Sequence, residues 1–314
     1  MDTIAVDLRD VEEALPVVRE VARHTPLVPD PTHEGAFLKL ENLQRLGAFK
    51  IRGTWNRLSR LSEADRRRGV ATISSGNHGL SLAWAARRLG IPCRVFVPEG
   101  ASPRKVDLIR KEGAEVAPMP RSELVHAHEA ETWRMWLETF VHPFAHAHTV
   151  AGAGTIGLEI VDDLPEVRTV LVPVGGGGLA SGIALAVNGL APQAKVLGVQ
   201  AEGAASLPEA LRTGQPYRVA DPKTIADGIR IGMVLPAMLP LLRRLDGCLL
   251  VSDGEITAAM RRLALEVKVV AEPAGAAAFA AYLRHRETLE PPVVCVVSGG
   301  NVETRLLADI LQGP

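Results

Sequence analysis

The sequence has no excess of charge of either sign, no long hydrophobic run and few cysteines. Its 35 basic and 36 acidic residues give a formal net charge of −1, which argues against nucleic acid or an anionic membrane as the main partner. No apolar run reaches the ~18 residues of a membrane span, and the acidic N-terminus lacks the apolar core of a signal peptide. These absences favour a soluble globular protein of 314 residues, long enough for two domains with buried cores.

The three cysteines, Cys93, Cys248 and Cys295, are odd in number, widely separated and outside any CxxC spacing. A disulfide framework is therefore not expected. Each cysteine lies beside an apolar run, so we predict buried free thiols in the reducing environment of the cytoplasm.

Short β-branched runs alternate with longer amphipathic stretches along the chain. Strands are predicted at 36–40, 70–74, 93–98, 167–174, 195–200 and 293–298, and helices at 77–90, 179–190 and 254–267. This alternation predicts an α/β fold of two intertwined domains, each a mostly parallel sheet flanked by helices. The first α/β block is expected to end near residues 142–154, where glycine and histidine replace helical periodicity.

Four consecutive glycines, Gly175 to Gly178, connect a predicted strand to a predicted helix. Such a run is entropically costly, and it suits backbone N–H groups that close around a phosphate at a helix N-terminus. The same stretch also satisfies the GxGxxG/A dinucleotide pattern, with Glu202 near the end of the next strand. Taken alone, the loop is compatible with a nicotinamide cofactor.

Two other strands also end in small and polar residues. The strand at 70–74 leads into SSGN and a helix, and the strand at 293–298 delivers SGGN. A helix cap explains one polar residue in such a loop but explains a run of four less well. Because ligands bind at the carboxyl ends of parallel strands, we expect both loops to belong to the site.

Four motifs then occur in the order and approximate spacing of one family. They are Lys50 in AFKIRG, SSGNHG at 74–79, GGGG at 175–178 and SGGN at 298–301. With them, the sequence resembles the pyridoxal-phosphate enzymes of the tryptophan-synthase-β fold type (fold type II), most of all the threonine/serine dehydratases and serine racemases. The segments HPF at 142–144, GTIGLEI at 154–160 and TIADGI at 224–229 resemble it too. The nicotinamide interpretation explains only the glycine loop, so we set it aside.

The resemblance implies how these residues would hold pyridoxal 5′-phosphate. Lys50 would carry it as a Schiff base and, once displaced by an amino acid, would remove the α-proton. Ser298 would face the pyridine nitrogen with a neutral hydroxyl, which favours loss of a β-substituent over transamination. The other cofactor contacts would be Phe49 against the ring, Asn77 at the ring hydroxyl, and Gly175, Gly176, Gly177, Gly178 and the N–H of Leu179 around the phosphate.

The loop after the strand at 70–74 would bind the substrate carboxylate. The residues implied are Ser74, Ser75, Gly76, Asn77 and His78. Ser75 has a second possible role, because a racemase needs an acid on the face of Cα opposite Lys50. The alternative is that Ser75 only caps the helix and binds carboxylate.

The predicted reaction is the dehydration and deamination of a serine- or threonine-type β-hydroxy-α-amino acid to a 2-oxo acid and ammonia. The alternatives are a serine or other amino-acid racemase, a dehydratase of a bulkier or acidic hydroxy amino acid, and a vitamin-B6-binding protein without turnover. We also expect a large cofactor-binding domain from 1–47 and 145–314, a small domain from 48–144, and a homodimer or higher homo-oligomer.

Some positions depart from the family or carry a second interpretation. Ala48 replaces a serine that usually lies near the phosphate, and Glu202 matches one ligand of a divalent-cation site whose downstream acidic ligand is absent, so we expect no metal. Arg52 is interpreted as a salt-bridge residue at a helix start. Glu272 is either an ordinary acid at a helix start or an acid near the substrate. The histidines 126, 128, 142, 146 and 148 match no zinc spacing and are expected on a solvated face or in a loop at the domain boundary.

Overall fold

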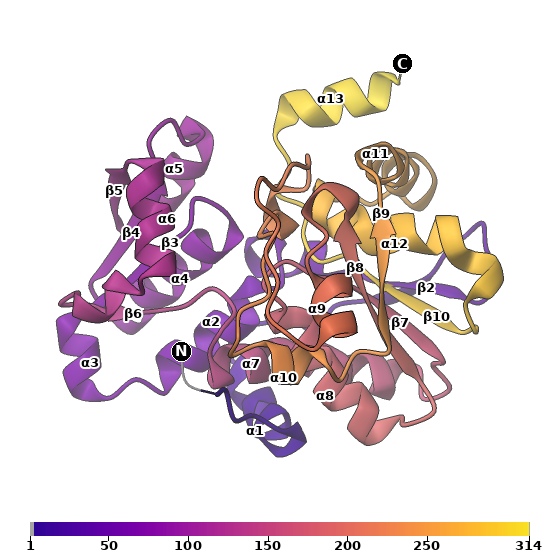
Figure 1. Ribbon diagram of the computed structural model, residues 1–314, viewed down its shortest axis with the longest axis horizontal. Coiled ribbons are helices and arrows are strands. Elements are labelled where there is room, and N and C mark those ends of the chain that lie inside the picture. Colours follow the sequence, from indigo (N-terminus) through magenta and orange to yellow (C-terminus); the bar gives the residue numbers. More distant parts are fainter. Residues whose placement is uncertain (1–2, 314) are drawn as a thin grey trace.

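The computed structural model describes residues 3–313 and contains two β-sheets that lie side by side (Figure 1). The first has the strand order β1-β2-β10-β7-β8-β9, parallel except that β1 is antiparallel to β2. Its strands are β1 (Leu27–Pro29), β2 (Ala36–Lys39), β7 (Thr169–Pro173), β8 (Lys195–Ala201), β9 (Gly247–Val251) and β10 (Val293–Val296). The second is fully parallel, in the order β5-β4-β3-β6, with β3 (Val70–Ile73), β4 (Cys93–Pro98), β5 (Glu115–Met119) and β6 (Thr139–Phe140).

Helices cover the sheets as the α/β pattern predicts. They are α1 (Leu8–Arg19), α2 (Lys50–Ser59), α3 (Glu63–Arg68), α4 (Asn77–Leu89), α5 (Pro103–Lys111), α6 (Arg121–Glu129), α7 (Ala147–Asp163), α8 (Gly178–Leu190), α9 (Leu207–Thr213), α10 (Leu239–Leu242), α11 (Asp253–Arg262), α12 (Pro273–His285) and α13 (Thr304–Gln312). In the described chain, residues 3–313, no helix is long and apolar enough to cross a membrane.

Side chains of the six-stranded sheet alternate between two cores. Val170, Val172 and Val294 pack with α1, α7 and α8, whereas Leu171 and Cys295 pack with α11 and α12 on the opposite face. Because successive side chains of a strand point to opposite faces, a strand buried on both faces is apolar throughout. The fold class predicted from the sequence is confirmed, and the domain boundaries at 48 and 144 stay a prediction.

The segment at 142–154 is partly helical, contrary to the sequence prediction. Helix α7 begins at Ala147 and runs through its glycines to Asp163. The glycines serve close packing: a Cβ at Gly152 would lie 2.6 Å from the carbonyl oxygen of Arg52, and one at Gly154 would lie 2.7 Å from that of Gly182. Helix α7 therefore contacts α2 and α8 at a distance that larger side chains would prevent.

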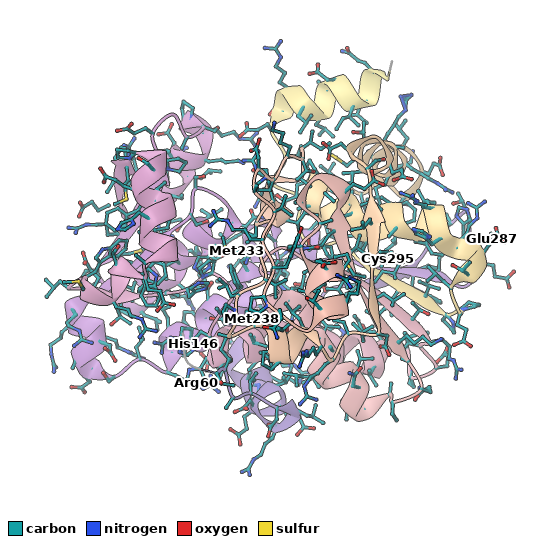
Figure 2. All side chains as sticks on the ribbon, in the orientation of Figure 1. Arg60, His146, Met233, Met238, Glu287 and Cys295 are labelled. Atoms are coloured by element: carbon teal, nitrogen blue, oxygen red, sulfur yellow. The ribbon has the colours of Figure 1, made fainter. Side chains whose placement is uncertain are left out.

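Two smaller expectations also need correction. Of the free thiols, Cys295 is buried but Cys93 and Cys248 are only half-buried. Cys248 lies on β9, the edge strand of the larger sheet, and Cys93 is the first residue of β4; Figure 2 labels Cys295 in the larger sheet. The helix predicted at 254–267 ends as an α-helix at Arg262 and continues as a π-helical turn, Leu263–Val267.

Candidate active site

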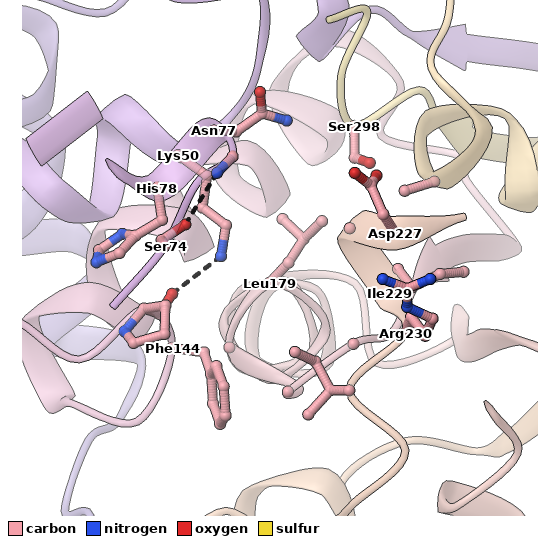
Figure 3. Close-up of a pocket in the computed structure, with 18 of the residues that line it drawn as sticks. Lys50, Ser74, Asn77, His78, Phe144, Leu179, Asp227, Ile229, Arg230 and Ser298 are labelled. Carbon is pink, nitrogen blue, oxygen red and sulfur yellow. Dashed lines mark hydrogen bonds between the residues drawn. The ribbon is translucent and has the colours of Figure 1, made fainter. Parts of the chain in front are cut away.

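A cavity of about 1020 Å³ lies between the two sheets. The loops that follow β3, β7 and β10 all open into it, as expected for the carboxyl ends of parallel strands. Its walls include every residue that the sequence analysis assigned to cofactor or substrate: Phe49, Lys50, Ser74, Ser75, Gly76, Asn77, His78, Gly175, Gly176, Gly177, Gly178, Leu179 and Ser298. Residues almost 250 positions apart in the chain thus share one site (Figure 3), while the role of each one stays a prediction.

Lys50 is the first residue of α2, and Phe49 is the N-cap. The Lys50 Nζ donates a hydrogen bond to the carbonyl oxygen of Pro143 at 2.9 Å (Figure 3) and lies 4.9 Å from the centre of the Phe49 ring. Burial lowers the pKa of Lys50 to about 8, although the negative charge of Glu272 acts in the opposite direction. At pH 7 roughly a tenth of this amine is therefore unprotonated, far more than for an ordinary lysine, and the unprotonated form is the one that acts as a nucleophile or a base.

The glycine loop leaves no room for side chains. A Cβ at Gly176 would lie 2.3 Å from the Phe144 ring, and one at Gly178 would lie 2.9 Å from the carbonyl oxygen of Phe144. Gly177 has a φ of +94°, a conformation that favours glycine, and it is the N-cap of α8. Since the first N–H groups of a helix have no intrahelical acceptor, this loop offers an anion a cradle of backbone donors.

Ser298 and His78 are buried polar residues in the cavity wall. Ser298 lies two residues after the end of β10, and its hydroxyl carries no charge. The His78 Nε2 lies 3.0 Å from the carbonyl oxygen of Val141, so Nε2 carries the hydrogen and Nδ1 is left as an acceptor. Burial, with the nearby charge of Lys50, lowers the pKa of His78 to about 3, which keeps the ring neutral.

Glu272 is the N-cap of α12, and its side chain turns into the cavity rather than capping the helix. One carboxylate oxygen accepts a hydrogen bond from the Asn77 Nδ2 at 2.7 Å. Burial and the charge of Asp227 raise the pKa of Glu272 to about 7. Of the two interpretations that the sequence left open, the geometry favours the acid near the substrate.

The cavity also has charged residues that the sequence analysis did not single out. Asp227 and Arg230 lie on the wall opposite Lys50 (Figure 3), and Lys105 reaches across from α5 to pair with Asp227 at 2.7 Å. Asp227 belongs to the TIADGI motif, which was noted only as a whole. Because no strand was predicted directly before this motif, the sequence analysis gave no reason to place it at the site.

Arg52, two residues after Lys50, belongs to a different group of charges. Its guanidinium bonds both Glu41 (2.7 and 2.9 Å) and Glu159 (2.6 and 2.9 Å), and Lys39 lies 2.9 Å from Glu159. These four side chains, which we name the Arg52 cluster, are at most 3% exposed. The salt-bridge interpretation of Arg52 is confirmed, and the bridge is buried.

The other candidates lie outside the cavity or serve structure. Glu202 is exposed and pairs with Arg284 at 3.0 Å, and the described residues contain no group of ligands suited to a metal ion. The histidines are divided: His126 is exposed and His146 lies in the loop before α7 (Figure 2), but the solvated-face interpretation is wrong for His142, which is buried against Phe144. The side chain of His128 lies outside the described residues.

Comparison with known proteins agrees with this geometry. The family model described as "Pyridoxal-phosphate dependent enzyme" matches residues 18–299. The chain belongs to this family. It is 39% identical to the L-threonine ammonia-lyase of Thermotoga maritima, over 98% of this chain and 78% of that protein, and 35% identical to a catabolic L-threonine dehydratase of Staphylococcus aureus, over 98% and 92%.

Solved structures of the pyridoxal-phosphate family give the same picture. Maize serine racemase matches with a TM-score of 0.88 and 30% identity, over 97% of this chain and 96% of that chain. A threonine deaminase from T.th. matches with a TM-score of 0.86 and 35% identity, over 95% and 99%. The fold-type-II family resemblance noted from the four motifs is confirmed.

The residues present fit pyridoxal phosphate. Gly175 to Gly178 form a cradle with no room for a Cβ, which suits a phosphate, and α8 adds the positive end of its dipole. Lys50 supplies an amine of lowered pKa for the aldehyde, and the neutral Ser298 hydroxyl can donate to an unprotonated ring nitrogen. The protein is thus a pyridoxal-phosphate-dependent enzyme.

Proposed function

We propose that this protein is an ammonia-lyase that converts a β-hydroxy-α-amino acid, threonine or serine, to a 2-oxo acid and ammonia. The main observation in support is that one cavity contains a lysine amine of pKa about 8, a glycine loop that can hold a phosphate and a neutral serine hydroxyl. The named relatives support it, since threonine ammonia-lyases and dehydratases match 98% of this chain.

Two parts of the site would position the substrate. The first N–H groups of α4, which begins at Asn77, have no intrahelical acceptor and would bind the α-carboxylate together with Ser74 and Ser75. That anchor would direct the Cα–H bond toward Lys50, whose amine holds one lone pair when unprotonated.

Pyridoxal phosphate, when bound, supplies the electron sink that stabilises negative charge at Cα. The Lys50 Nζ would remove the proton from Cα, and the β-hydroxyl would leave as water with its bonding electrons and with that proton, returned by the Lys50 ammonium. Released product is an enamine, which becomes an imine and is hydrolysed by water to the 2-oxo acid and ammonia. Ser298 cannot place a negative charge at the ring nitrogen, which limits the lifetime of charge at Cα and favours elimination.

The first experiment is an assay of the purified protein on L-threonine, L-serine and D-serine. We expect a yellow protein that releases 2-oxo acid from an L-hydroxy amino acid, and borohydride reduction should fix the cofactor mass on Lys50. A colourless protein that takes up no pyridoxal phosphate would contradict the proposal. Cofactor uptake without turnover of any hydroxy amino acid would indicate a binding protein instead.

A racemase is the second candidate, because Ser75 lines the same cavity as Lys50 and serine racemases of maize and Dictyostelium discoideum share the fold with TM-scores of 0.88 and 0.87. A serine hydroxyl on the far face of Cα could return a proton there. Ser75→Ala should leave elimination from the L-enantiomer within about tenfold, roughly 1.4 kcal/mol in barrier, and should abolish reaction of the D-enantiomer. If wild-type protein forms D-serine faster than pyruvate, racemisation is the main activity.

We also propose that the enzyme is cytoplasmic and forms a homodimer or a higher homo-oligomer. The exposed apolar side chains Leu265 and Val270, 47% and 45% exposed, support a covered surface near α12. Light scattering of the eluted protein should give a mass of at least two chains.

A further inference from the structure

Asn77 is held by two side chains from a different part of the molecule. Its Nδ2 donates to Glu272 at 2.7 Å, and its Oδ1 accepts from the Asn301 Nδ2 at 2.8 Å. Asn77 follows β3 of the four-stranded sheet, whereas Glu272 caps α12 and Asn301 follows β10 of the six-stranded sheet. We name Glu272 and Asn301 the Asn77 clamp.

The hydrogen bonds that link Asn301, Asn77 and Glu272 form a series, and the groups at its two ends fix the direction of each bond. The Asn301 Nδ2 also donates to the carbonyl oxygen of Leu46 at 2.7 Å, and a carbonyl oxygen can only accept. Asn301 therefore uses both of its hydrogens and must face the Asn77 oxygen. At the other end an ionised Glu272 can only accept, so it must face the Asn77 nitrogen. The amide of Asn77 cannot flip without breaking two hydrogen bonds.

The surrounding backbone is built closely around the clamp. A Cβ at Gly299 would lie 2.4 Å from the Glu272 Oε1, and a Cβ at Gly47 would lie 2.6 Å from the Asn301 Oδ1. Two glycines thus make room for the two clamp side chains. One hydrogen of the Asn77 Nδ2 remains after the bond to Glu272, and Asn77 lines the cavity.

We propose that Glu272 and Asn301 are positioning residues that hold the Asn77 amide with this N–H toward the ring hydroxyl of pyridoxal phosphate. The inference rests on the proposed function, which places the cofactor ring beside Asn77. Because the three side chains come from both sheets, the clamp also fixes the SSGN loop, and with it the carboxylate site, relative to the cofactor.

The test measures affinity of the apoprotein for pyridoxal phosphate and for its 3-deoxy analogue, which lacks the ring hydroxyl. Tryptophan fluorescence quenching gives both dissociation constants without any turnover. The dissociation constant of the 3-deoxy analogue divided by that of pyridoxal phosphate is the preference for the hydroxyl. Asn77→Ala removes the proposed donor, so the preference measured for this variant is the baseline expected without the hydrogen bond. Wild type should exceed that value by about tenfold, as expected for one well-placed hydrogen bond.

Glu272→Ala and Asn301→Asp should lower the preference to that of Asn77→Ala, since the first removes the acceptor and the second replaces the donor by a carboxylate of the same shape. Glu272→Gln keeps an oxygen acceptor for the Asn77 Nδ2, so it should retain the preference within about twofold. Glu303→Gln is the matched control: it removes a charge from the same cavity wall, but Glu303 bonds Ser102, and the preference should stay at the wild-type value.

Three outcomes would contradict the inference, and a folding failure of one variant would change which variants decide it. If Glu272→Ala and Asn301→Asp keep the wild-type preference while Asn77→Ala loses it, Asn77 acts without the clamp. If Glu272→Ala fails to fold by circular dichroism, the isosteric Asn301→Asp and Glu272→Gln variants decide the result. If wild type binds pyridoxal phosphate with the preference of Asn77→Ala, the hydroxyl contact itself is wrong. If wild type takes up no pyridoxal phosphate at all, the proposed function fails and this inference with it.

Discussion

Lys50 and Arg52 are buried charged residues only two positions apart on α2, but their surroundings shift their pKa values in opposite directions. Although burial alone would lower the pKa of Arg52, Glu41 and Glu159 together raise it above its ordinary value. The amine of Lys50 has one hydrogen bond, to Pro143, and no ion pair among residues 3–313, and burial lowers its pKa.

The difference shows which buried charges are free to react. A buried ion that bonds several partners stays ionised and holds elements together, since removing its partners would leave uncompensated charge. A buried ion with few partners titrates near neutral pH and can exchange a proton with a ligand. Helix α2 thus joins a fixed charge to a reactive one, and the fixed charge secures the position of the reactive one.

The largest expected effect is on activity. Lys50→Ala should reduce turnover by several orders of magnitude because it removes both the nucleophile and the base. The variant should still bind pyridoxal phosphate without a covalent bond and should fold, since no ion pair is broken. Steady-state assays and mass spectrometry after borohydride treatment measure both effects. A variant with more than a tenth of wild-type turnover would exclude Lys50 as the central residue.

The next effect is on stability. Arg52→Met should lower the free energy of unfolding by roughly 3–5 kcal/mol, because Glu41 and Glu159 would be left buried without their main partner. Lys50→Met should change it little or raise it, because that amine is desolvated with few contacts in return. Denaturant unfolding of the two apoproteins gives the comparison, and equal losses for both variants would remove the distinction between the two sites.

Two carboxyl groups should give opposite pH trends in stability. Burial alone would raise the pKa of Glu159, but Arg52 and Lys39 hold it below 4.5, so its contribution is present above that value and is lost as the pH falls through the folded pKa. Burial raises the pKa of Glu272 from 4.5 to about 7, so its contribution is present below pH 4.5 and is lost as the pH rises through 7.

The matched variants Glu159→Gln and Glu272→Gln test these trends in the apoprotein. The stability of wild type relative to Glu272→Gln should fall between pH 5 and pH 8. Relative to Glu159→Gln, wild type should lose stability only in acid. Chemical unfolding at each pH measures both differences, and slopes of the same sign would show that the cavity does not raise the pKa of Glu272.

The smallest effect is expected for an exposed set of charges. Arg284 bonds Glu202 and Glu255 on the surface, where water and salt screen the pair. Arg284→Met should leave the midpoint of thermal unfolding within experimental error and insensitive to added salt. A loss of stability as large as that of Arg52→Met would mean that the exposure of an ion pair does not predict its contribution to stability in this protein.

Much of the fold and the site was predictable because both depend on local patterns. The predicted strands correspond to β2, β3, β4, β7, β8 and β10, of which β3, β7 and β10 are buried along their whole length, and the loops after these three strands show polar and glycine-rich composition. Strands β5 and β9 were missed because EVAPM and GCLLV have no clear period and depend on pairing with β4 and β8. Helix α7 was missed in part because its glycines serve contacts with other helices.

The partners of buried charges were not predictable from the sequence. Glu272 and Asn77 are 195 positions apart and Arg52 and Glu159 are 107 apart, and no local pattern specifies which acid meets which base. The resemblance named the motifs, but the geometry shows that Glu272 belongs with Asn77 and that Arg52 belongs with Glu41 and Glu159.

The strand order of the six-stranded sheet has a consequence for how the protein is made. Strand β10 lies between β2 and β7, so β2, which pairs with β1 on one side, must wait for its second partner, synthesised roughly 250 residues later, a delay of about 10–50 s at typical translation rates. The strands of the four-stranded sheet all emerge before β7, and that sheet can assemble first. A nascent chain shorter than about 295 residues has an open edge at β2 and lacks the SGGN loop. With Ser298 in the cofactor role proposed above, the cofactor would be captured only after the SGGN loop has been synthesised, and chaperones have the intervening time to act on the exposed strand.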